Sequence, residues 1–236
     1  MKRTAGAAAI AGAVLAIVGN AALFAVQPVV SADKLSWPLS PHAYVYMQLF
    51  FALTQLLMAA GILGLVRSDA VRPGRAARIL GVLAVAGMAL TVPGELVLIL
   101  VRRDDASASA VSALSSVFGL GVLLADAGLI GLGVLALRQH RWSRGWAALP
   151  LVLGVFQLVV VTPVSLAEGF TSVPSNVAIG VADALTALIG VRLLQARTAG
   201  EPSLARRGER RARPGAPAAR GELPSPVSPR ARRAGR

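Results

Sequence analysis

The chain alternates between long runs of apolar residues and short polar segments. A bilayer core about 30 Å thick needs about 20 apolar residues in a helix to cross it. Six runs meet this length: residues 5–30, 44–66, 79–101, 111–137, 147–167 and 176–196. The runs are continuously apolar, which excludes the alternating strands of an antiparallel barrel. Because the backbone must satisfy its own hydrogen bonds in lipid, the pattern predicts an all-α membrane protein with a six-transmembrane-helix bundle.

The pattern changes after residue 196. Segment 197–236 contains eleven Arg and six Pro but almost no large apolar residues, so it cannot bury enough surface to offset the entropy of ordering. We therefore predict a transmembrane domain over 1–196 and a disordered basic tail over 197–236. The tail has two readings, contact with anionic lipid or a solvated segment that only fixes the topology. The solvated segment is the favoured reading.

Composition narrows the class of protein further. The chain is 55% hydrophobic and 15% charged, whereas a soluble domain is roughly a quarter charged. It has no Cys, which excludes a disulfide scaffold. The net charge of +13 is spread over loops and tail, without the basic face that a nucleic-acid surface needs. His42 and His140 fall on opposite sides of the predicted bundle, so we expect no metal site and no cofactor.

The basic residues predict the orientation of the bundle, because cytoplasmic loops carry an excess of Lys and Arg. With the N-terminus inside, the inner segments hold nine basic residues: Lys2, Arg3, Arg67, Arg72, Arg75, Arg78, Arg138, Arg141 and Arg144. The outer loops hold three, Lys34, Arg102 and Arg103, and Asp104 and Asp105 follow the last two directly. Both termini are therefore predicted to be cytoplasmic.

Aromatic residues fit this orientation, since Trp and Tyr favour the two membrane interfaces. Trp37, Tyr44 and Tyr46 are expected at the outer interface, and Trp142 and Trp146 at the inner one. Arg192 lies near the inner end of the last run, from which its long side chain is expected to reach water.

The first run has an alternative reading as a secretory signal. Lys2 and Arg3 precede the run, and Ser31 and Ala32 supply small residues for cleavage. The apolar stretch exceeds the 7–15 residues of a typical signal core. A retained helix is therefore the favoured prediction.

Three carboxyl residues interrupt the apolar runs: Glu95, Asp126 and Asp183. A charged side chain within a membrane costs about 2.5–3.5 kcal/mol on the insertion scale, and none of the three has an obvious cation at its own depth. A rise of 1.5 Å per residue places Glu95 about 9 Å and Asp183 about 10 Å below the outer boundary, with Asp126 nearer the middle. These residues are our candidates for binding a proton or cation.

Helical spacing groups further polar and small residues with these carboxyls. Asn176 and Asp183 share a face, as do Ser112, Ser116, Gly119 and Asp126. Asn20, Gln157 and Asn176 are the predicted lining of a polar cavity that opens outward. Pro93 and Pro163 are expected to bend their helices close to these groups and to free carbonyls there.

Two functions remain open on this evidence. The leading hypothesis is a transporter-like bundle that binds a proton, cation or small solute. The alternative is a non-catalytic membrane partner or assembly subunit, in which the same polar residues hold helices together. An enzyme is not expected. Gly180-Val181-Ala182-Asp183 is similar to the G-x-G-D motif of intramembrane aspartyl proteases, but Ala182 replaces the second Gly.

Several segments carry a resemblance to a broader group of proteins. They are the Met1-Lys2-Arg3 start, the Trp37-Pro38-Leu39-Ser40-Pro41 loop, the Arg-Pro-Gly-Arg segment at 72–75 and the Arg-rich tail. With them the chain resembles the six-span integral membrane proteins of unassigned activity found in high-GC actinobacteria. The resemblance implies a location in a bacterial plasma membrane and no particular reaction. A protein partner or a homo-oligomer remains open.

Overall fold

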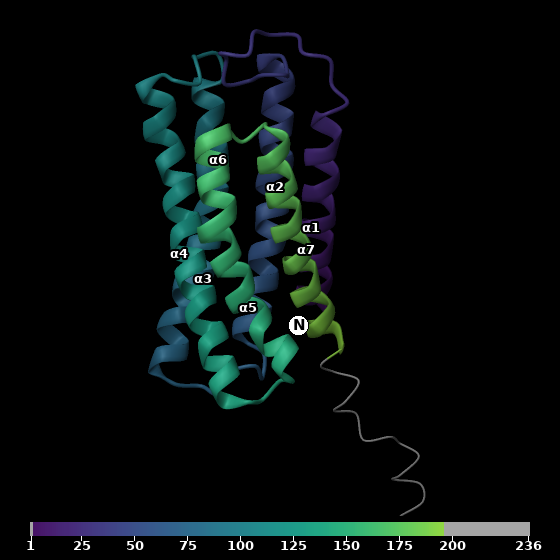
Figure 1. Cartoon of the computed structure of the whole chain (residues 1–236), viewed down its shortest axis with the longest axis vertical. Coiled ribbons are helices and arrows are strands. Elements are labelled where there is room, and N and C mark those ends of the chain that lie inside the picture. Colours follow the sequence, from purple (N-terminus) through teal and green to yellow (C-terminus); the bar gives the residue numbers. More distant parts are fainter. Residues whose placement is uncertain (1, 196–236) are drawn as a thin grey trace, which may run out of the picture. The chain divides into compact units, whose positions relative to one another are not determined.

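The structure, a computed structural model, describes residues 2–195 (Figure 1). Within that range the chain is all-helical apart from loops and one isolated β-bridge. The predictions of disorder and lipid contact for segment 197–236 concern residues outside the described part.

Nine helical segments make up the described chain, and together they form six spans. The segments are α1 (Lys2–Leu23), α2 (Pro41–Val66), α3 (Arg75–Val97), η1 (Leu98–Val101), α4 (Ser109–Gln139), α5 (Arg144–Phe156), η2 (Gln157–Val161), α6 (Thr162–Glu168) and α7 (Val173–Gln195). The 3₁₀ segment η1 continues α3, and the π-helical segment η2 joins α5 to α6. Six helices are thus long and apolar enough to cross a membrane, and the predicted six-helix bundle is confirmed.

The first two helices end and begin where local sequence signals place them. The helix α1 ends at Leu23, before the end of the apolar run, and single turns follow it. Gln27 precedes Pro28, and a proline disfavours helical geometry at the residue before it. The helix α2 begins three residues earlier than its apolar run, at Pro41. Its N-cap is Ser40, whose Oγ accepts a 3.2 Å hydrogen bond from the Ala43 N–H.

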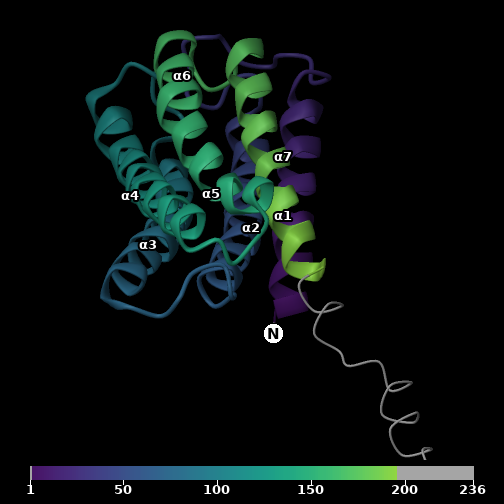
Figure 2. The same cartoon turned by 60° about the horizontal axis from the view of Figure 1, so that its bottom comes forward.

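The helices form a closed ring in which the first and last helices are neighbours. The helix α1 packs against α2 and α7, α3 packs against α2 and α4, and α5 packs against α4 and α7. Additional contacts between α2 and α7 close the inside of the ring. Figures 1 and 2 show α1 and α7 side by side.

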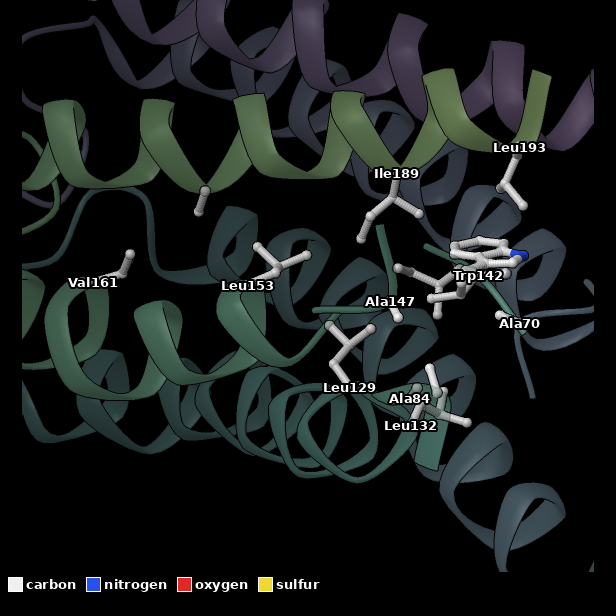
Figure 3. Close-up of a cluster of buried hydrophobic side chains, with 14 of the residues drawn as sticks. Ala70, Ala84, Leu129, Leu132, Trp142, Ala147, Leu153, Val161, Ile189 and Leu193 are labelled. Atoms are coloured by element: carbon white, nitrogen blue, oxygen red, sulfur yellow. The ribbon is translucent and has the colours of Figure 1, made fainter. Parts of the chain in front are cut away.

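The interior of the ring is apolar, and the outside is apolar as well. Leu153, Ile189 and Leu193 are at most 1% exposed and belong to one buried cluster, shown in Figure 3. On the outer surface, Val82 and Val159 are 61% and 63% exposed. Such surfaces suit contact with lipid tails. The chain is therefore described below as a multi-pass membrane protein.

Glycines allow α3 and α4 to pack in close contact. Gly87 and Gly94 lie seven residues apart on α3, and Gly121 and Gly128 lie seven apart on α4. A Cβ added at Gly121 would lie 2.9 Å from the Gly87 carbonyl oxygen, and one added at Gly87 would overlap the backbone at Ala125. Small residues let two backbones touch directly, and such contacts hold membrane helices together.

The loops before α2 and before α4 are joined to each other. The Leu35 N–H donates to the Asp104 carbonyl at 3.0 Å, and the Lys34 ammonium lies 2.7 Å from an Asp105 carboxylate oxygen. The hydrogen bond and negative charge of Asp105 raise the pKa of Lys34 above its ordinary value of 10.5. The stabilisation of the folded state by this ion pair is fully present below pH 10.5 and is lost as the pH rises through the raised pKa of Lys34. Because the pair is exposed, its contribution is small.

The packing of α3 against α4 predicts a difference between two glycines of the same helix. In the variant Gly128→Ala the new methyl group would overlap the Ala84 backbone, and we expect a loss of about 1–3 kcal/mol in stability. The matched control is Gly119→Ala, where a Cβ meets nothing within 4 Å, so its stability should be unchanged or slightly higher. Thermal unfolding in detergent measures both. Equal stability of the two variants would contradict the packing described.

Candidate functional site

Asp126 has the smallest exposed fraction of the three candidate carboxyl residues. It lies near the middle of α4 with an exposed fraction of 0%. Neither of its carboxylate oxygens has a hydrogen-bond partner. A buried polar atom without a partner costs about 1–3 kcal/mol, and an isolated buried carboxylate costs far more than the neutral acid. The Asp126 carboxyl group is therefore buried without a compensating hydrogen bond among the described residues.

Close helix contacts on two sides explain why Asp126 is enclosed. On one side its neighbour Ala125 meets α3 at Gly87, as described above. On the other side α5 approaches at Gly154, where an added Cβ would lie 2.9 Å from the Asp126 carbonyl oxygen. Three helices thus meet at the level of this carboxyl group, and glycine is what lets them do so.

Asp183 lies on α7 and is also nearly buried. It is 7% exposed, and its Oδ2 has no hydrogen-bond partner. Asn176, seven residues earlier on the same face, is also 7% exposed. The Asn176 amide donates to the carbonyls of Phe170 at 3.2 Å and Ser172 at 3.0 Å. Asn176 therefore holds the loop before α7, while its Oδ1 remains without a partner.

Glu95 occupies a different environment, towards the C-terminal end of α3. Its side chain is partly buried, and its backbone carbonyl accepts a 3.1 Å hydrogen bond from the Gln48 amide of α2. This bond links two helices directly, as a structural polar contact does. Asn20 is also partly buried, close to the end of α1.

Gln157 begins the π-helical segment η2, in the span that contains Pro163. The Thr162 N–H donates to the Gln157 carbonyl across this wide turn. Pro163 has no N–H with which to bond a carbonyl one turn earlier, which accounts for an irregular turn at this point. The structure thus has a π turn next to Pro163, whereas Pro93 lies inside the α-helix α3; the predicted bends at both residues stay predictions. Such turns are frequent at functional sites.

The candidate residues are not gathered into one cluster. Among the described residues α4 and α7 do not pack on each other, whereas η2 contacts both. The segment that begins at Gln157 thus lies between the helices of Asp126 and Asp183. Within residues 2–195, no group of three or more His, Asp or Glu side chains is placed to hold a metal ion.

The predicted polar face of α4 is wrong outside Asp126 itself. Ser112 and Ser116 are exposed, and the Ser116 hydroxyl donates to the Ser112 carbonyl 2.9 Å away. An added Cβ at Gly119 would meet nothing within 4 Å. The spacing of these residues is helical, but α5 and its continuation cover only the part of α4 that contains Asp126.

The expectation for Trp142 also needs correction. Trp142 is 6% exposed and belongs to the buried cluster in Figure 3. The Arg192 guanidinium carbon lies 4.9 Å from the centre of the Trp142 ring, a cation–π contact. Trp142 is therefore part of the core and packs against Arg192, where an interfacial Trp was expected; Arg192 is partly exposed, and its reach to water stays a prediction. Their similar depth near one end of the bundle was the available sequence signal.

Comparisons with protein-family models, curated proteins and solved structures found no match to this chain. The candidate site therefore has to be interpreted from its own geometry.

The hydrogen bonding of Asp126 and Gln48 predicts that leucine substitutions at the two positions change stability differently. Asp126→Leu keeps the branching of the side chain and removes two oxygens that lack partners, so stability should not fall. Gln48→Leu removes the hydrogen bond to the Glu95 carbonyl, and stability should fall by about 0.6 kcal/mol, the average for polar pairs between membrane helices. Unfolding in detergent compares the two. A greater loss in Asp126→Leu would show that this carboxyl serves to hold helices together.

Proposed function

We propose that the chain is a transporter-like membrane protein that binds a proton, or a small cation in its place, within its helix bundle. Asp126 is the principal binding group in this proposal, and Asp183 and Glu95 are accessory groups. Binding serves movement of the ion itself or of a small solute coupled to it. Asn20, Gln157 and Asn176 are the hydrogen-bonding lining.

One observation carries the proposal: the Asp126 carboxyl group is fully buried and neither oxygen has a partner. A residue retained only to join helices is expected to bond across the interface, as Gln48 does to the Glu95 carbonyl. Asp126 makes no such bond. Burying these oxygens without hydrogen bonds costs stability. A role in proton binding would account for a carboxyl group at this position, since intramembrane carboxyls commonly serve in proton relays.

The π segment supports the same function. It contacts the helices of both Asp126 and Asp183, and Pro163 leaves a nearby carbonyl without its helical donor. Free backbone carbonyls are suitable ligands for a proton donor or a cation within a membrane. The segment that starts at Gln157 is thus a suitable connection between the two carboxyls.

The alternative function is a non-catalytic partner or assembly subunit. The Gln48–Glu95 contact favours it at the outer end of the bundle, because that contact is structural. That bond is accepted by the Glu95 backbone carbonyl, so the carboxyl groups of Glu95, Asp126 and Asp183 all remain unexplained in this alternative.

Location and orientation are part of the proposal. We place the protein in a bacterial plasma membrane, as its resemblance to actinobacterial six-span proteins implies, with both termini in the cytoplasm. The nine-to-three distribution of basic residues supports this orientation. We assign it no enzymatic reaction.

Proton flux into liposomes tests the proposal. The purified protein is reconstituted with a pH-sensitive dye inside, and a potassium diffusion potential drives protons inward. We expect flux in the wild type and a reduction of about tenfold or more in Asp126→Asn, since a buried amide cannot exchange a proton in this role. The matched control is Asp104→Asn, the same chemical change at an exposed loop carboxyl, which should leave flux unchanged.

Asp183→Asn and a sodium gradient complete this test. Reduced proton flux in Asp183→Asn supports its accessory role, and sodium flux that depends on Asp126 identifies a cation as the bound ion. Proton and sodium flux that are the same in the wild type, Asp126→Asn and Asp183→Asn would reject the proposal.

A further inference from the structure

A pocket of about 340 Å³ lies at the end of the bundle where α2 ends and α3 begins. Its walls come from the loop between these two helices, from the last turns of α4 and from the start of the next span. Its volume is within the range of small-molecule sites, about 300–1,000 Å³. It lies outside the region of Asp126, and nothing in the proposed function uses it.

The pocket is strongly basic. Four arginines line it, Arg67, Arg72, Arg78 and Arg141, together with a single acidic residue, Asp69. Counting Asp69 against the four arginines leaves a formal charge of +3 (four minus one) on the lining. Planar guanidinium groups bind phosphate and carboxylate oxygens through paired, charge-assisted hydrogen bonds. The lining therefore suits an anion with several oxygens.

The deeper part of the pocket is apolar. Leu65, Leu132 and Ala136 line it and are at most 4% exposed, and Pro150 lines it as well. A fully hydrated ion gains nothing from contact with such an apolar floor. An apolar floor beneath a basic rim instead suits an amphipathic ligand, whose phosphate meets the arginines and whose carbon skeleton meets the floor.

The wall that carries the arginines is held in place. The Ser68 hydroxyl accepts a 3.2 Å hydrogen bond from the Ala70 N–H, and Ala70 is 2% exposed within the buried cluster. The Arg72 N–H donates to the Gln139 side chain of α4 at 2.5 Å. The loop is thus anchored both to the core and to α4, and the backbone that carries its arginines is positioned before any ligand binds.

We infer that this pocket binds the phosphate group of an anionic amphipathic ligand, and that an anionic phospholipid headgroup is the source the apolar floor favours. Basic pockets between membrane helices on the cytoplasmic side bind such headgroups. With the predicted orientation the pocket faces the cytoplasmic leaflet, whose anionic lipids supply this chemistry. A soluble phosphate ester has the same polar group but leaves the floor uncovered.

Nanodiscs of defined composition test the inference. The full chain is placed in discs of phosphatidylcholine alone or with a minor fraction of phosphatidylglycerol, and its unfolding temperature is measured. Phosphatidylglycerol should raise this temperature in the wild type, because a ligand that binds only the folded state stabilises it. In Arg72→Gln/Arg141→Gln the rise should be lost, with binding weakened by about tenfold or more.

A matched control removes the same charge outside the pocket. Arg75→Gln/Arg144→Gln changes two exposed arginines at the same end of the bundle that do not line the pocket, and this variant should keep the rise. If the pocket double variant does not fold, Arg72→Gln and Arg141→Gln are measured singly, and each should weaken the response.

Glycerol 1-phosphate, added to discs of phosphatidylcholine alone, distinguishes the two sources of phosphate. A rise that depends on Arg72 and Arg141 would support the phosphate site and assign it to a soluble ester. Equal losses in the pocket and control variants, or no loss in either, would overturn the site in favour of general charge attraction. All these outcomes are independent of proton flux through Asp126, so the two proposals fail separately.

Discussion

The close contact between α3 and α4 is the constraint on which the rest of the bundle depends. Gly87 and Gly121 bring the two backbones into direct contact, and in lipid such packing takes the place of hydrophobic association between helices. With α3 and α4 this close, and with Gly154 admitting α5, Asp126 is enclosed by three helices. The burial of that carboxyl group is thus a consequence of the glycines around it.

The middle of the bundle and one of its ends differ in the charged groups that they contain. Towards the middle of the bundle, carboxyl groups are enclosed among apolar residues, and Asp126 and Asp183 have oxygens without partners. Near the end where α2 meets α3, arginines surround an open pocket with an apolar floor. Between them, Arg192 lies against the buried Trp142 ring. The proposed binding of a proton or small cation thus concerns the enclosed carboxyl groups, and the proposed binding of an anion concerns the basic pocket.

Much of the fold could be predicted from the sequence, because the length of the apolar runs fixes the number of spans. Helix ends were harder to predict from the sequence where short turns follow the helix, as after Leu23. The burial of Asp126 and Asp183 also followed from their place in apolar runs. The exposure of Ser112 and Ser116 did not, because helical spacing gives the face of a residue but not the length over which a neighbouring helix covers that face.

Two features of the site required tertiary structure. The pocket arginines come from separate loops, and only the folded chain shows that Arg141 faces the same space as Arg67, Arg72 and Arg78. Likewise, the π segment follows from Pro163 locally, but its place between α4 and α7 depends on the order of helices around the ring.

Infrared difference spectroscopy of the membrane-reconstituted protein tests the central claim most directly, since it detects the carboxylic acid group itself. Spectra recorded in acidic and alkaline buffer should differ by a protonated-carboxyl band from the apolar interior. The part of that band that Asp126 contributes should be lost in Asp126→Asn and kept in Asp104→Asn. Difference spectra that superimpose in the wild type and Asp126→Asn would contradict the assignment of Asp126 as the group that binds and releases a proton.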